Sequence, residues 1–187
     1  MTAPPVQRTL TTTDYLRMAE EAIIAPDERV ELIDGEIVPI SPQSNRHNEP
    51  IPRLIVLLSR QSSGLEDSIS CQATLVLDEV NAFEPELVVF RAESAVDYPT
   101  AESALLVVEV GRSTLSQDLK IKLSACASAG IPEYGVFDVR GKNIRVPRDP
   151  EREACTYKPA SRFSGDQAVS SLVDPTIKIT PSQLIRL

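Results

Sequence analysis

The chain has 187 residues, of which 42% are hydrophobic and 25% charged, a balance that is typical of a globular protein and excludes an extensively disordered one. Its formal net charge of -8 weighs against tight nonspecific binding to nucleic acid, because phosphate contacts come from Lys and Arg. A local basic face remains compatible with this charge. The length fits one domain, so we expect a single domain over residues 1–187 with a loose tail at residues 1–10.

Cysteine and histidine usage excludes several kinds of site. Cys71, Cys126 and Cys155 are scattered, which argues against a disulfide framework and against a structural zinc site. The single histidine, His47, excludes the His-Glu-x-x-His zinc helix, and neither a Gly-x-Ser-x-Gly elbow nor a glycine-rich phosphate loop is present. No apolar run approaches the ~18 residues of a membrane helix. We see no signal peptide either, so we expect a cytoplasmic protein without a membrane segment.

The first predicted helix covers residues 14–21. Thr12 or Thr13 is a suitable N-cap, and Pro26 stops the helix. A β-hairpin is predicted next, over residues 30–40, because two apolar segments flank Asp34-Gly35, a dipeptide that favours a type I′ turn.

Two candidate polar residues lie on or after this hairpin. Glu31 either has a structural role in the hairpin or points into a cleft. His47 lies in a polar loop, where it is either solvated or able to donate to phosphate and adjust a nearby carboxylate. A second helix is predicted over residues 49–62, since its apolar residues recur on one stripe.

Three strands are predicted in the middle of the chain, over residues 68–78, 85–90 and 105–110. The last two are short apolar runs, each interrupted by one acid: Glu86 at the entry of one strand and Glu109 inside the other. A carboxylate is almost never buried without a partner, so each acid must reach water or meet a cation.

The helix predicted at residues 115–129 follows the strand that holds Glu109. Thr114 and Gln117 form a capping box at its start. Lys122 lies at the edge of the apolar stripe, where its stem can follow the sheet and present the ammonium at the strand ends. Asp118, four residues earlier, is placed for an ion pair with Lys122 within the helix.

Two further strands, residues 133–138 and 143–146, are joined by a turn, and residues 155–187 suggest short strands with a final short helix after Pro181. A basic run accompanies the second strand and is either a solvated hairpin or a track for phosphates. Its members are Arg140, Lys142, Arg145 and Arg148.

Glu86, Glu109 and Lys122 together suggest a hydrolytic site. Two carboxylates with a backbone carbonyl and several waters suit Mg²⁺. A bound Mg²⁺ lowers the pKa of its water and polarises a phosphoryl oxygen, while a lysine can orient that water. The alternative is structural: Glu86 is an exposed strand-end acid, Glu109 forms a partly buried salt bridge with Lys122, and Asp118 supports the helix.

Several stretches together resemble the PD-(D/E)XK, restriction-endonuclease-like superfamily, and more closely the bacterial Uma family of endonuclease-like proteins. The resemblance covers most of the chain. The matching stretches are residues 31–38 (Glu-Leu-Ile-Asp-Gly-Glu-Ile-Val), Ser41-Pro before His47, residues 77–88, residues 107–110, Ser113-Thr with Asp118 and Lys122, and residues 129–134 with Asp138.

The resemblance implies a restriction-endonuclease-like α/β core, a mixed β-sheet flanked by helices, with an N-terminal β-hairpin and added C-terminal strands. It implies that Glu86 and Glu109 are catalytic residues that bind Mg²⁺ or Mn²⁺. The superfamily's lysine usually follows the second acid by two residues, where this chain has Gly111; family members carry it on the next helix, which matches Lys122. Gly135 stands where relatives have an aromatic residue.

We therefore expect a metal-dependent endonuclease that hydrolyses phosphodiester bonds of DNA. Glu31, His47 and Asp118 are secondary candidates for the site. The alternative is a catalytically inactive protein of the same fold that binds nucleic acid or a protein partner, or that serves as a homodimeric scaffold.

Overall fold

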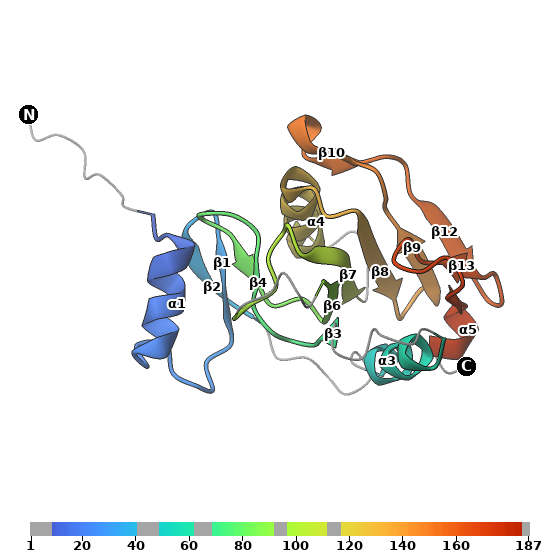
Figure 1. The fold of residues 1–187 in the computed structure, drawn as a ribbon, viewed down its shortest axis with the longest axis horizontal. Helices are drawn as coiled ribbons and strands as arrows, with labels where there is room; N and C mark the ends of the chain where they lie inside the picture. Colours follow the sequence, from blue (N-terminus) through green and yellow to red (C-terminus); the bar gives the residue numbers. More distant parts are fainter. Residues whose placement is uncertain (1–8, 41–48, 62–68, 92–96, 112–116, 185–187) are drawn as a thin grey trace, which may run out of the picture.

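The computed structural model describes residues 9–40, 49–61, 69–91, 97–111 and 117–184 of the chain. In this part of the chain, a six-stranded sheet of order β12-β9-β8-β7-β6-β3 stands beside a four-stranded sheet of order β2-β1-β5-β4 (Figure 1). The helices are α1 (Thr12–Glu20), α3 (Pro50–Gln61), α4 (Gln117–Ala129) and α5 (Pro181–Leu184), with a 3₁₀ turn at Arg152–Ala154. The strands of the two sheets are β1 (Val30–Ile33), β2 (Glu36–Pro39), β3 (Ile69–Ser70), β4 (Leu75–Val76), β5 (Ala82–Phe83), β6 (Leu87–Phe90), β7 (Ala104–Gly111), β8 (Glu133–Asp138), β9 (Asn143–Val146) and β12 (Ser161–Ser164). Two small ribbons are formed by β10 (Pro150–Glu151) with β11 (Thr156–Tyr157) and by β13 (Val169–Ser170) with β14 (Lys178–Ile179).

Helix α1 begins at Thr12, two residues earlier than the sequence suggested. Its N-cap is Thr11, and the expectation of Thr12 or Thr13 was wrong. The Thr11 hydroxyl accepts from the Asp14 N–H at 3.1 Å, and the Asp14 carboxylate accepts from the Thr11 N–H at 3.0 Å, which completes a capping box. Thr12 instead donates its hydroxyl to the Asp78 carbonyl at 2.6 Å, so α1 is attached to a distant loop.

The hairpin of β1 and β2 is confirmed, with Asp34 and Gly35 both at positive φ as a type I′ turn requires. Gly35 also lies against the chain that leads into α1: a Cβ there would stand 2.6 Å from the Thr9 Cβ. On the inner side of the hairpin, Val30 and Leu32 pack against Tyr15 of α1. Alternation along β1 therefore turns Glu31 to the opposite side, towards α4.

The single strand expected at residues 68–78 was wrong for the described residues 69–78. The chain forms β3 and β4, which belong to different sheets, and residues 71–74 between them have no strand structure. The break occurs at Gln72, whose φ of 49° is left-handed and cannot continue a strand. Strand β5, which was not anticipated, then pairs with both β1 and β4.

The predicted strands 85–90, 105–110 and 133–138 form the centre of the larger sheet. Strand β6 pairs antiparallel with β7, and β7 pairs parallel with β8 through the crossover that contains α4. A parallel pair needs such a crossover, and its strands are buried on both faces, which explains their continuous apolar runs.

The two faces of this sheet bury different clusters. Leu54 and Leu58 of α3 and Leu184 of α5 pack on one face, whereas Leu119, Cys126 and Ala127 of α4 pack on the other. Figure 1 shows α4 on one side of the sheet and α3 with α5 on the opposite side. Gly130, at a φ of 84°, ends α4 as the sequence predicted.

A small cavity adjoins Gly135 in the middle of β8. It has a volume of about 40 Å³ and is lined largely by apolar side chains, among them Val108, Phe137 and Val169. A Cβ added at Gly135 would stand 3.4 Å from the Val108 Cγ2 atom, which is an ordinary van der Waals contact.

We predict that Gly135→Ala stabilises the protein by roughly 0.5–1 kcal/mol, because alanine restricts the unfolded chain and adds a methyl group where there is room. The free energy of unfolding in urea measures the effect. A loss of stability would show that the cavity does not accept the methyl group.

Tyr15 connects α1 to the hairpin by donating its hydroxyl to the Val30 carbonyl at 2.8 Å. Burial raises the pKa of Tyr15 to about 12, and the charges of Glu84 and Glu31 add to this rise. Since the folded protein favours the neutral phenol, this stabilisation is complete below pH 10 and is lost between pH 10 and about 12.

We therefore predict that the stability difference between the wild type and Tyr15→Phe shrinks as the pH rises from 10 to about 12. Urea unfolding of both proteins across this range measures it. A difference that stays constant with pH would contradict the raised pKa.

Candidate active site

Lys122 is the centre of the candidate site, and α4 positions it. Leu119 and Cys126 on the same side of the helix are buried against the sheet, so the lysine stem must follow them inward. Its ammonium Nζ lies 2.7 Å from Glu31 Oε1 and 3.4 Å from Glu109 Oε1. The same atom lies 6.0 Å from the centroid of the Phe83 ring. One cation thereby connects β1, β7 and α4.

Glu31 holds this lysine from the smaller sheet. Its Oε1 atom also accepts a hydrogen bond of 2.8 Å from the backbone N–H of Glu84, just after β5. The carboxylate is therefore fixed by its own strand and by a neighbouring loop before it meets the ammonium. The Glu31 side chain is thus buried against Lys122 and does not line the hollow beside α4.

Glu109 lies in β7, and Glu86 immediately precedes the neighbouring strand β6. The last pair of β6 with β7 is Leu87 with Val108, so Glu86 is one residue beyond it and level with Glu109. Glu86 Oε2 accepts a hydrogen bond of 3.2 Å from Gln72 Nε2. The left-handed backbone of Gln72 points this amide at the acid, and strain of this kind is common at functional sites.

All four charged side chains are nearly buried. Glu31 and Glu86 are 3% exposed, and Glu109 and Lys122 are 5% exposed. The alternative that Glu86 is an exposed strand-end acid is therefore wrong. Burial strengthens each Coulombic contact but also makes the loss of any one partner costly.

Cys126 lies one helical turn after Lys122, and the charges of the site affect the pKa of its thiol. Burial raises the pKa of its thiol, the charge of Glu109 raises it further, and Lys122 opposes the rise. A thiol held protonated in this way is a small apolar side chain and not a nucleophile.

Few side chains at the site could bind a metal ion. The described residues contain no group of three or more His, Cys, Asp or Glu side chains arranged to hold one. A metal at Glu86 and Glu109 would thus have two carboxylate ligands, with backbone carbonyl and water completing its shell. This set suits Mg²⁺, which keeps several waters, and does not suit a zinc site.

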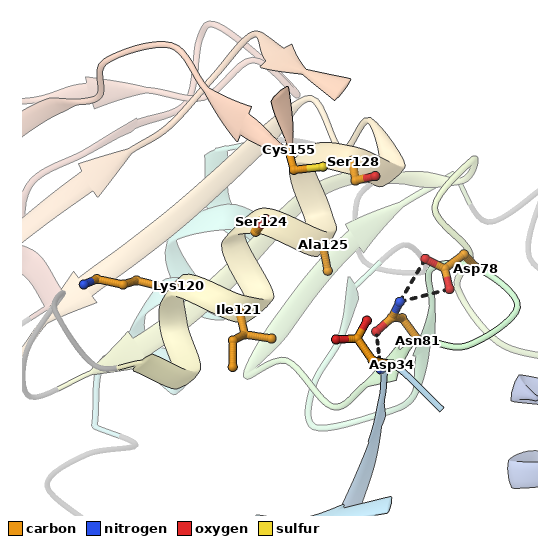
Figure 2. Close-up of a pocket in the computed structure, with 9 residues that line it drawn as sticks. All are labelled: Asp34, Asp78, Asn81, Lys120, Ile121, Ser124, Ala125, Ser128 and Cys155. Atoms are coloured by element: carbon orange, nitrogen blue, oxygen red, sulfur yellow. Dashed lines mark hydrogen bonds between the residues drawn. The ribbon is translucent and has the colours of Figure 1, made fainter. Parts of the chain in front are cut away.

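A hollow of about 410 Å³ adjoins α4 (Figure 2). In Figure 2 the side chains of Asp34, Asn81 and Asp78 stand opposite α4, with the Asn81 amide between the two acids. Asn81 donates to both carboxylate oxygens of Asp78, at 3.1 and 3.0 Å. The hollow and the Lys122 cluster share a helix, but neither Lys122 nor its acids line the hollow.

The predicted site residues have different outcomes in the structure. Glu109 and Lys122 come together, Glu31 joins them, and Glu86 lies just before the adjacent strand β6. His47 lies outside the described residues, as does the Thr114 part of the predicted capping box. The side chain of Asp118 is likewise outside them, so its expected ion pair with Lys122 is not tested.

Two contributors were missed by the sequence analysis, Gln72 and Phe83. Gln72 had been assigned to the interior of a strand, and no local pattern indicates its left-handed backbone. Phe83 belongs to the short strand β5, which a two-residue apolar pair cannot signal. Both reach the site only because distant segments pack together.

The comparisons with known proteins agree with this architecture. A solved structure from Anabaena variabilis ATCC 29413, described as "a putative nuclease belonging to DUF820", shares the fold with a TM-score of 0.71 and 12% sequence identity. The match covers 94% of this chain and 97% of that one. The curated proteins contain no match. The two chains therefore share one fold, a mixed β-sheet flanked by helices.

The family model of Uma2, described as "Putative restriction endonuclease", matches residues 12–180. This chain belongs to the Uma2 family, which confirms the resemblance seen in the sequence. Within the described residues, no helix has the length and apolar character needed to cross a membrane.

We predict that Lys122→Met destabilises the protein by about 3–5 kcal/mol, because methionine replaces the stem but leaves Glu31 and Glu109 buried without this cation. Urea unfolding measures the change. Lys120→Met is the matched control, since Lys120 is exposed on the same helix, and it should change stability by no more than about 0.5 kcal/mol. Equal effects of the two substitutions would contradict a structural role for the buried ammonium.

Proposed function

We propose that this chain is a metal-dependent nuclease that hydrolyses phosphodiester bonds of DNA. Membership in a family described as "Putative restriction endonuclease" supports a nuclease activity on DNA. The metal, Mg²⁺ or Mn²⁺, and the residue roles rest on the chemistry of the site itself.

The observation that carries the proposal is the approach of the Lys122 ammonium to within 3.4 Å of Glu109, an acid level with Glu86 on the next strand. Two carboxylates and an ammonium from a sheet and its crossover helix are the groups that phosphodiester hydrolysis needs. They come from residues far apart in the chain, and Gln72 holds Glu86 while Glu31 holds Lys122.

In the proposed reaction, Glu86 and Glu109 would hold the metal, which when bound supplies an acidified water and polarises a phosphoryl oxygen. Lys122 would orient the attacking water and offset the charge of the phosphate. The water oxygen forms a bond to phosphorus, and the bond from phosphorus to the leaving sugar oxygen breaks. The products are a phosphate monoester and a hydroxyl group.

Glu31 is assigned a positioning role. It holds Nζ at 2.7 Å and is itself fixed by the Glu84 N–H, so the ammonium has a defined place beside Glu109. Catalysis depends on such placement, because a displacement of 1 Å can cost about 100-fold in rate.

A second candidate function is a catalytically inactive protein that binds nucleic acid or a protein partner, or that forms a homodimeric scaffold. The burial of the cluster favours it: acids and lysine no more than 5% exposed are what a purely structural ion-pair network requires. The two functions differ in one respect, which is whether metal-dependent cleavage occurs.

We predict that the protein cleaves DNA only with Mg²⁺ or Mn²⁺ and that Glu109→Gln lowers the cleavage rate by at least about 100-fold, because the substitution removes a ligand charge and misplaces the metal. Gel analysis of plasmid and linear DNA measures the rate. Glu102→Gln, the same change at an exposed acid before β7, should retain the full rate. Absence of cleavage in the folded wild type with either metal would favour the inactive alternative.

A further inference from the structure

The basic residues around β8, β9 and β12 divide into groups with different roles. Arg148 donates to Glu133 Oε1 from Nε at 3.0 Å and also binds the Ser170 carbonyl, so it holds the fold together. Arg140 and Lys142 lie in the exposed turn between β8 and β9. Arg145 belongs to neither group.

Arg145 lies directly opposite Arg162 of the edge strand β12 in the antiparallel pair of β9 and β12. Like charges at opposed positions destabilise a sheet, because their side chains leave the same face at close range. In the part of the chain that the structure describes, no acidic side chain forms an ion pair with either arginine. An anion between the two guanidinium groups would replace this repulsion with attraction.

The Nε atom of Arg145 gives a second, independent observation. It is buried and has no hydrogen-bond partner in the structure, whereas the residue as a whole is only partly buried. A buried donor without an acceptor costs stability, and an oxygen of a bound ligand would satisfy it. Arg162 beside it is exposed. Together they form a partly sheltered, partly open pair of guanidinium groups.

The strand registers place this pair in line with the candidate active site. Across the sheet, Glu109 of β7 pairs with Val136 of β8, Val136 pairs with Arg145 of β9, and Arg145 pairs with Arg162 of β12. On the other side of β7, Glu86 lies one residue beyond the pair of Leu87 with Val108. Residues in one such row project from the same face of the sheet. Neighbouring strands are ~4.8 Å apart, so Arg145 and Arg162 lie roughly 10 and 14 Å from Glu109. In Figure 1, β9 and β12 form the side of this sheet that is away from β6 and β3.

We infer that Arg145 and Arg162 form a phosphate-binding site for the backbone of a nucleic acid, on the sheet face that carries the acids. Guanidinium groups bind phosphate oxygens through paired N–H donors, and a phosphate oxygen would satisfy the buried Nε. The inference rests on the proposed function for its choice of ligand. It adds a phosphate contact at the β9–β12 edge of the sheet, beyond the part of this face that α4 covers.

The test measures binding separately from cleavage. In a Glu109→Gln background, anisotropy of fluorescein-labelled duplex DNA is recorded over a range of salt concentrations, with and without the double substitution Arg145→Ala, Arg162→Ala. We expect binding to weaken on the order of tenfold or more at low salt. The slope of log K against log salt should fall by about 2, one for each lost phosphate contact.

Arg60→Ala in the same background is the matched control. Arg60 is exposed in the last turn of α3, which covers the opposite face of the sheet, and its loss changes the net charge in the same direction. Its salt slope should stay at that of the parent. Compared with Arg145→Ala, the substitution Arg145→Lys keeps the positive charge but lacks the Nε donor, so it should recover only part of the affinity for DNA.

The melting temperature separates a ligand site from a structural role. Removing a repelling pair with an unsatisfied donor should leave the melting temperature unchanged or raise it, whereas loss of a structural contact would lower it. DNA binding by the double variant equal to that of the Arg60→Ala control overturns the inference, as does a parent that binds no DNA. The proposed function is judged apart from this, by metal-dependent cleavage in the protein that retains Glu109.

Discussion

The contact of the Lys122 ammonium with Glu31 and Glu109 is the constraint on which the arrangement of this protein depends. Glu31 belongs to the smaller sheet, Glu109 to the centre of the larger sheet, and Lys122 to the crossover helix between two parallel strands. A buried ammonium tolerates little displacement from its acids, because each added ångström weakens attraction in a medium of low dielectric constant. The position of one sheet relative to the other is therefore set where the chemistry is proposed to occur.

Much of the larger sheet could be predicted from sequence because its signals are local. A few consecutive residues are enough to predict the apolar strands β6, β7 and β8 and the Asp-Gly turn. The segment 68–78 misled for the same reason: its alternation fits a strand, but alternation does not say which sheet a strand joins. The change of partner at Gln72 depends on packing against residues that are distant in the chain.

The site was predictable to a similar extent. Lys122 at the edge of a helical stripe and Glu109 inside an apolar strand are anomalies that a sequence displays directly, since burial of each requires the other. The contribution of Glu31 required the smaller sheet to lie against α4, and no periodicity encodes that. The overall charge of -8 averages over the chain and does not display the arginines that lie on β9 and β12.

Glu133 begins β8, is 1% exposed, and receives most of its hydrogen bonds from segments made later. Arg148 donates to one of its oxygens, and the Ser171 hydroxyl and the Leu172 N–H donate to the other, each at 2.8 Å. During synthesis, a nascent chain that has emerged only as far as residue 168 has neither of the last two donors to offer. In such a chain, the Glu133 carboxylate in the central sheet would lack both donors to its Oε2 atom. Completion of the fold must therefore wait until the segment that carries Ser171 and Leu172 has left the ribosome.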